Sequence, residues 1–406
     1  MQGKPHARTR GFQAAKERTV TMNGRFVEFG LSMSASTPTP SAPLPPGKPT
    51  QIDWPDAQRQ QAFTRWITAL APAHSLQLAS LRPASADASF RRYLRLDSAN
   101  GSSLIVMDAP PDKENCRPFV QVQALAHAAG LRVPAILAWD ETQGFMLLED
   151  LGGPTVLERL DSQRPEEAHG WYLQAVDELL RWQQASQPGV LPAYDAALLQ
   201  RELQLFPDWY VARHRALPLD DKQHATLVQA FERIVQHNLT APSVYVHRDY
   251  MMRNLLVPPA PGQRLGVLDF QDAVYGPITY DLASLLRDAF ISWEEDFVID
   301  IAVRYWEKAR KAGLLGSASH SGWGADFGDF YRAVEWMGLQ RHLKVAGIFA
   351  RLTLRDGKPR YLADTPRFIG YIRSSAARYR ELAPLLRLVD HIEGHSAPVG
   401  YAFGRM

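Results

Sequence analysis

Three residues close together in the sequence carry side chains suited to phosphoryl transfer: Asp249, Asn254 and Asp269. Such a reaction needs one carboxylate that orients the attacking hydroxyl and accepts its proton. It also needs an amide oxygen and a second carboxylate to hold magnesium against the nucleotide phosphates. Asp249 is therefore the candidate catalytic base, and Asn254 and Asp269 are the candidate magnesium ligands. A helix-capping or turn role for Asp249 would not explain why the other two follow in register.

Two short apolar runs could bring these residues together. The run 255–257 follows Asn254 directly, and the run 265–268 leads directly into Asp269. We expect the two runs to pair as a hairpin across the loop from Pro258 to Gln263. That hairpin would place Asp269 beside Asn254 and create a metal site.

The wider pattern predicts an α+β fold of two lobes. Before the break at Leu151-Gly152-Gly153-Pro154, strand-like runs dominate, and beyond it the chain turns mostly helical. We expect strands at 76–81, 90–96, 104–107, 135–139 and 145–149, and helices at 63–70, 118–129, 171–184, 197–213 and 223–237. The expected divisions are a disordered, proline-rich extension (1–50), an antiparallel-sheet N-lobe that binds nucleotide (51–152), a mostly helical C-lobe (153–392) and a C-terminal tail (393–406).

Composition excludes several classes of protein. With 406 residues and 46% hydrophobic content, the chain can bury a core in two lobes. The 45 basic and 43 acidic residues are mixed along the chain, so nucleic acid is not an expected partner. No apolar run is long enough to span a membrane, and a single cysteine excludes an internal disulfide. We therefore expect a cytoplasmic enzyme, with magnesium as its only metal.

The string His247-Arg248-Asp249, followed by Asn254 and then by Leu268-Asp269-Phe270, resembles the catalytic and metal-binding segments of the protein-kinase superfold. Too few residues precede Tyr280-Asp281-Leu282-Ala283 to form an activation loop, and no Ala-Pro-Glu follows. The resemblance is therefore to the aminoglycoside phosphotransferase-like branch. It implies that Asp281 is buried and braces the catalytic loop, and that His247 shapes the same loop.

Longer strings resemble the bacterial N-acetylmuramate and N-acetylglucosamine anomeric kinases of cell-wall recycling. These strings are 87–93, 106–111, 268–277 and 341–349. The resemblance covers about residues 55 to 390. It implies ATP-dependent transfer to the C1 hydroxyl of an amino sugar in peptidoglycan recycling, with the sugar 1-phosphate passing to a uridylyltransferase. It also implies that the turn Ser89-Phe90-Arg91 covers the phosphates and that Glu149 to Leu151 form the hinge that binds adenine.

The chain departs from the general kinase pattern in its phosphate contacts. Met107 stands where the third strand should end in lysine, and the helix after it, 116–130, contains no acid to pair with such a lysine. Another cation is expected to neutralise the phosphates. Arg91 and Arg92 are the first candidates, followed by Lys113.

Basic and aromatic residues on the expected helix 327–351 suggest where an acidic sugar could bind. Trp336, Arg341 and Lys344 are the candidate substrate-binding residues, because cations would favour the lactyl carboxylate of N-acetylmuramate. The alternative is that these are solvated charges on a surface helix.

Two other functions stay open at this stage. One is a kinase of the same branch that acts on another small hydroxyl substrate, such as an aminoglycoside, choline or homoserine. The other is a pseudokinase that binds ATP without turnover. The missing lysine and the absence of glycine from residues 85–89 favour this alternative. Loss of activity on Asp249→Asn would support either enzyme.

Overall fold

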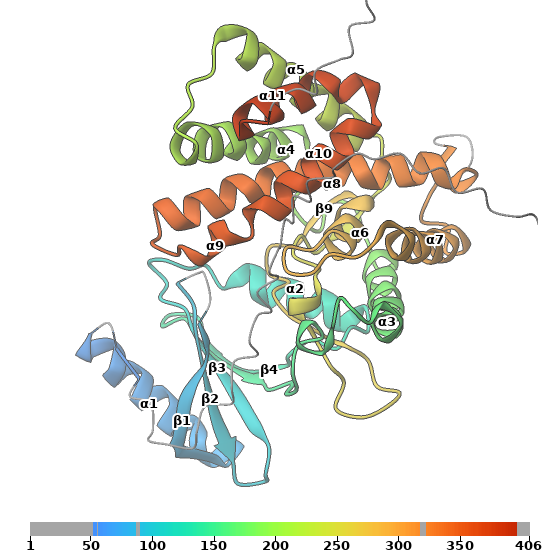
Figure 1. The fold of residues 1–406 in the computed structure, drawn as a ribbon. Helices are drawn as coiled ribbons and strands as arrows, with labels where there is room; N and C mark the ends of the chain where they lie inside the picture. The colour runs from blue at the N-terminus through green and yellow to red at the C-terminus, as the bar shows by residue number, and fades with distance from the viewer. Residues whose placement is uncertain (1–51, 55, 87–89, 317–321, 396–406) are drawn as a thin grey trace, which may run out of the picture. The chain divides into compact units, whose positions relative to one another are not determined.

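The computed structural model describes residues 52–54, 56–86, 90–316 and 322–395, which belong to one compact unit, Thr50–Met406. The predicted extension (1–50), most of the predicted tail and Ser89 lie outside the described residues. The expected α+β class is confirmed: an antiparallel sheet precedes a mostly helical remainder (Figure 1). Among the described helices, none has the length and apolar character needed to cross a membrane.

A five-stranded antiparallel sheet in the order β1-β2-β3-β5-β4 forms the first part of the fold. Alternate residues of its strands face two different helices. Val106 and Leu147 pack with Phe63 of α1, whereas Met107 and Met146 pack with the core that contains α2. The elements are α1 (Ala57–His74), β1 (Leu76–Ala86), β2 (Arg92–Ser98), β3 (Ser103–Asp108), α2 (Arg117–Ala128), β4 (Ile136–Asp140) and β5 (Phe145–Glu149).

Helices dominate the rest of the chain, which also contains two small antiparallel pairs of strands. β6 pairs with β9, and β7 pairs with β8. The elements are α3 (Pro165–Gln184), α4 (Ala196–Leu203), η2 (Phe206–His214), α5 (Asp221–Asn238), β6 (Ser243–Val246), β7 (Leu255–Leu256), β8 (Gly266–Val267), β9 (Val274–Pro277), α6 (Thr279–Leu286), α7 (Glu295–Lys311), α8 (Phe327–Leu354), α9 (Arg360–Ala363), α10 (Thr365–Arg378) and α11 (Ala383–Glu393). Short 3₁₀ turns occur at Leu157–Arg159, Met252–Asn254, Gly322–Gly324 and Arg380–Leu382.

The expected single helix over 197–213 is wrong, because the chain forms α4 and then the π-helical segment η2. Pro207 lies at the start of η2 and has no N–H to donate to the preceding turn, so a regular α-helix cannot continue through it. The wider turn stacks Phe206 on Tyr210, with ring centroids 5.3 Å apart.

The long helix α8 runs through the middle of the helical region, with α5 and α10 above it and α6 below it in Figure 1, and it contacts all three. Its middle is buried on all sides, including charged residues such as Arg341 and Lys344. A β-carbon at Gly347 would lie 2.3 Å from the carbonyl oxygen of Leu205, so the absence of a side chain lets α8 approach the segment before η2. The middle of α8 therefore lies in the interior of the helical region and not at its surface.

Candidate active site

The predicted hairpin forms and brings Asn254 and Asp269 together. Leu255 pairs with Val267 and Leu256 with Gly266, and the Leu268 N–H donates to the Asn254 carbonyl at 2.9 Å. The Asn254 Nδ2 donates to Asp269 Oδ2 at 3.2 Å and to the Asp249 carbonyl at 2.9 Å. Both bonds use the amide nitrogen, so they leave Oδ1 of Asn254 available to a cation.

Two residues in this loop system have left-handed backbone angles. Arg248, directly before Asp249, has a φ of 78°, and Asp269 has a φ of 64°. Such angles are costly for side chains other than glycine, asparagine or aspartate, and they occur often at functional sites. Surrounding contacts must therefore hold the loop at Arg248.

Asp281 of α6 holds the loop from behind. Its side chain is completely buried and accepts hydrogen bonds from the His247 N–H at 2.6 Å and the Arg248 N–H at 2.9 Å. Burial raises the pKa of Asp281 to about 7, although these two donors act against the rise. Asp281 touches only backbone in these bonds, which suits a bracing residue.

His247 joins the loop to the segment directly after β8, the second strand of the hairpin. Its Nε2 lies 3.0 Å from the Leu268 carbonyl oxygen, one residue before Asp269. Burial lowers the pKa of His247 to about 4, so the ring is neutral at physiological pH. Nε2 then acts as the donor to Leu268.

Glu202 of α4 lies at the centre of a buried charge network next to the catalytic loop. It forms an ion pair with Arg248, accepts from Tyr194, and has Lys344 Nζ 3.0 Å from its Oε1. Burial alone would raise the pKa of Glu202, but Lys344 and Arg248 lower it to about 2. Lys344 also donates to Tyr280 at 3.0 Å. Burial would lower the pKa of Lys344, but Tyr280 and Glu202, with a smaller contribution from Asp249, raise it.

The structure buries the three substrate-binding candidates of α8, so the alternative of solvated charges on a surface helix is wrong for them. Trp336, Arg341 and Lys344 are only 3%, 2% and 7% exposed. Trp336 stacks on His237, with ring centroids 4.4 Å apart. Burial raises the pKa of the carboxyls of Asp281 and Asp288. The positive charge of Arg341 offsets part of this rise in both. These side chains serve internal contacts because α8 is covered on every side, and periodicity cannot reveal that cover.

A cavity of about 540 Å³ lies between the five-stranded sheet and the β7–β8 hairpin. It brings together predicted hinge residues, Glu149 and Leu151, and predicted metal ligands, Asn254 and Asp269. Tyr93, Arg95, Ile105, Phe119, Leu148, Arg253 and Phe270 also line it. The geometry can therefore hold a ligand between the hinge and the carboxylates.

The predicted phosphate-covering residues lie elsewhere in the described structure. Phe90 is 64% exposed, and neither it nor Arg91 nor Arg92 lines this cavity. Arg91 forms an ion pair with Glu114 at 3.3 Å, and Arg92 forms one with Asp108. Lys113 lies over the Phe90 ring at 5.4 Å.

The residue that sequence reasoning missed is Arg253, which lines the cavity beside Asn254. Its position inside the catalytic motif was a signal that could have found it.

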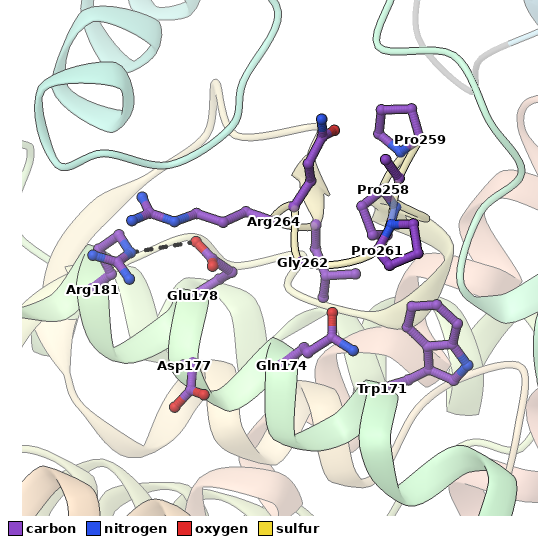
Figure 2. Close-up of a pocket in the computed structure, with 13 residues that line it drawn as sticks. Trp171, Gln174, Asp177, Glu178, Arg181, Pro258, Pro259, Pro261, Gly262 and Arg264 are labelled. Atoms are coloured by element: carbon purple, nitrogen blue, oxygen red, sulfur yellow. Dashed lines mark ion pairs between the residues drawn. The ribbon is translucent and has the colours of Figure 1, made fainter.

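A second cavity, of about 710 Å³, lies between α3 and the loop from Pro258 to Leu265 (Figure 2). Trp171, Gln174 and Glu178 line it from α3, and an ion pair at 3.5 Å joins Glu178 to Arg181. None of the predicted site residues lines this cavity. The catalytic motif is therefore associated with the first cavity.

Comparison with known proteins identifies the family. Residues 80–315 match the model of the phosphotransferase enzyme family. This chain belongs to that family. A Neisseria meningitidis serogroup B protein named N-acetylmuramate/N-acetylglucosamine kinase is 47% identical over 348 residues, which are 85% of this chain and all of that protein. A Pseudomonas aeruginosa protein with the same name is 51% identical over 312 residues, or 77% of this chain and 88% of that protein.

A solved structure confirms the family's fold. The ethanolamine kinase of Plasmodium vivax shares a TM-score of 0.55 with this family member, at 11% identity, over 79% of this chain and 91% of that one. The predicted kinase-like, aminoglycoside phosphotransferase-like fold is confirmed. The protein is a phosphotransferase that uses a hydroxyl group as acceptor.

Proposed function

We propose that this protein is an ATP-dependent kinase that phosphorylates the C1 hydroxyl of N-acetylmuramate, N-acetylglucosamine or both. The geometric support is the placement of Asn254 and Asp269 side by side, with the Asn254 amide bonded to the Asp249 backbone, at one end of a cavity that reaches the hinge. The choice of sugar rests on the names of relatives at 47% and 51% identity. Because the cations of α8 are buried, they give no reason to prefer the acidic sugar, and the proposal covers both.

Each of the candidate site residues has its own role in the phosphoryl transfer. Asp249 orients the acceptor hydroxyl and takes its proton as the oxygen bonds to the γ-phosphorus. The bond from that phosphorus to the β–γ bridging oxygen breaks, and ADP leaves with the electron pair. Mg²⁺ would be held by Asn254 and Asp269, whose amide and carboxylate oxygens suit a hard cation, and would offset charge on the phosphates. Glu149 to Leu151 would hydrogen-bond adenine at the hinge.

Bracing contacts keep this set in place. Asp281 and His247 hold the loop through backbone groups, and we propose that neither contacts phosphate. In this proposal they position Asp249 and Asp269, and Lys344 acts through Glu202 rather than on the sugar. We also propose a cytoplasmic role in peptidoglycan recycling, in which a uridylyltransferase consumes the sugar 1-phosphate.

An ADP-release assay with magnesium ATP tests the proposal. N-acetylmuramate, N-acetylglucosamine, kanamycin and choline are offered in parallel, with Asp249→Asn as the blank. We expect release with one or both sugars, and a 1-phosphate product by phosphorus NMR. Release with kanamycin or choline alone would overturn the sugar assignment. Nucleotide binding without turnover by any acceptor would favour a pseudokinase.

A further inference from the structure

The charges that line the catalytic cavity are out of balance. Four carboxylates line it, those of Glu149, Asp150, Glu158 and Asp269, against two guanidinium groups, those of Arg95 and Arg253. Asp150 accepts a hydrogen bond from Arg95 Nε at 2.6 Å, so Arg95 is already paired. A triphosphate would add further negative charge to this cavity. Beside Mg²⁺, a cation that is not committed to a carboxylate would therefore favour its binding.

The strand position that should supply this cation cannot do so. Met107 is completely buried and packs in the core with the α2 side chains. The other basic candidates of the sheet are committed: Arg91 to Glu114 and Arg92 to the buried Asp108. Replacing either pairing by a phosphate would leave a carboxylate without its partner.

Arg253 differs from these residues in its surroundings. The Arg253 side chain is exposed and lines the cavity. In the sequence, Arg253 directly precedes Asn254. Its Cζ lies 4.8 Å from the centroid of the Phe290 ring. Within the described part of the chain, no carboxylate forms an ion pair with it. An aromatic face orients a guanidinium without cancelling its charge, so this charge stays available to a ligand.

We propose that Arg253 supplies the phosphate-facing positive charge that the missing strand lysine would otherwise provide. Its guanidinium donates to non-bridging oxygens of the terminal phosphates of ATP, a geometry that arginine can satisfy with two parallel hydrogen bonds. Because the cation lies next to the metal ligand Asn254, it offsets charge on the group being transferred. This inference rests on the proposed function only in taking ATP as the donor, and it is independent of the sugar.

Calorimetric titration of the full chain with ATP, ADP and AMP, with magnesium and without sugar, tests the inference. Arg253→Gln should weaken ATP binding by about 10- to 100-fold, the usual worth of a charged hydrogen-bonded contact, and leave AMP binding unchanged. Arg253→Lys should recover part of the loss. Arg117→Gln is the matched control, because Arg117 is a 76% exposed arginine whose ion pair is with Glu141 at the surface.

Each result has a defined meaning. Unchanged ATP affinity in Arg253→Gln, an equal loss for AMP, or a loss in Lys113→Gln instead would overturn the inference. A change confined to the sugar KM would also overturn it, because Arg253 would then serve the acceptor. ATP loss in Arg253→Gln without any sugar turnover by the wild type would sustain the inference and reject the sugar assignment. Wild-type protein that binds no ATP would reject both.

Discussion

The carboxylate of the buried Glu202 forms an ion pair with the half-buried guanidinium of Arg248, the residue directly before Asp249. In regulated protein kinases, ordering of the active site depends on an added phosphate in the activation loop that pairs with arginine. Here a permanent internal carboxylate holds the arginine of the catalytic loop. The contact helps to keep Arg248 at its left-handed φ of 78° and with it the position of Asp249.

Removing the charge of Glu202 should destabilise the protein and slow the reaction. Glu202→Gln leaves Arg248 and Lys344 facing each other without a counter-charge, which should cost about 3 kcal/mol of unfolding free energy. The double variant Glu202→Gln with Lys344→Met keeps the wild-type net charge of the three residues. Urea unfolding and kcat are measured for both. If positioning matters, the double variant regains stability while kcat stays low. Full recovery of kcat would show that Glu202 only balances charge.

The buried His247 predicts a pH dependence of stability with a definite sign. Its folded pKa of about 4 lies below the ordinary value of 6.5, so the unfolded chain binds more protons between these pH values. Its contribution to stability is therefore lost as pH falls from about 6.5 to 4, by up to about 3 kcal/mol. Urea unfolding of wild type and His247→Gln at several pH values isolates this contribution. A stability difference that does not change with pH contradicts the prediction.

The Asp269 side chain can be changed without disturbing its backbone. Asparagine tolerates the left-handed region, so Asp269→Asn should fold normally at its φ of 64°. Loss of the carboxylate charge should lower kcat by about 10²- to 10³-fold and raise the Mg²⁺ concentration needed for half-maximal rate. Circular dichroism checks the fold, and a magnesium titration of the rate checks the ligand role. An unchanged magnesium requirement would show that Asp269 does not hold the ion.

Two glycines in neighbouring helices should respond in opposite ways to alanine. Gly347→Ala in α8 would place a β-carbon 2.3 Å from the Leu205 carbonyl oxygen, so it should destabilise the protein by about 1 to 3 kcal/mol. Gly370→Ala in α10 meets no atom within 4 Å, so better helix propensity should stabilise it by up to about 1 kcal/mol. Thermal unfolding of both variants measures the contrast. Equal shifts in Tm would mean that α8 adjusts its distance from Leu205.

Local spacing in the sequence was enough to predict a candidate catalytic motif and the hairpin that carries part of it, and the structure confirms the hairpin. Asn254 directly precedes one strand of the hairpin, and Asp269 follows shortly after the other. Pairing of the two strands therefore brings the Asn254 and Asp269 side chains together. Three strand pairings of the sheet, β1–β2, β2–β3 and β4–β5, likewise join neighbours in the chain, and hydrophobic patterns record such local contacts. The pairing of β3 with β5 spans α2 and β4, so local patterns do not determine it.

Only the tertiary structure decided which charges are used internally and which face the cavity. Glu202, Arg248 and Lys344 meet across long stretches of chain, and α8 is buried by helices that no local pattern places around it. For the same reason Arg91 and Arg92 pair with carboxylates while Arg253 faces the ligand cavity. The free energy of a charged side chain depends on burial and on partners distant in sequence, so residue type and spacing determine the chemistry available, and packing determines where it is used.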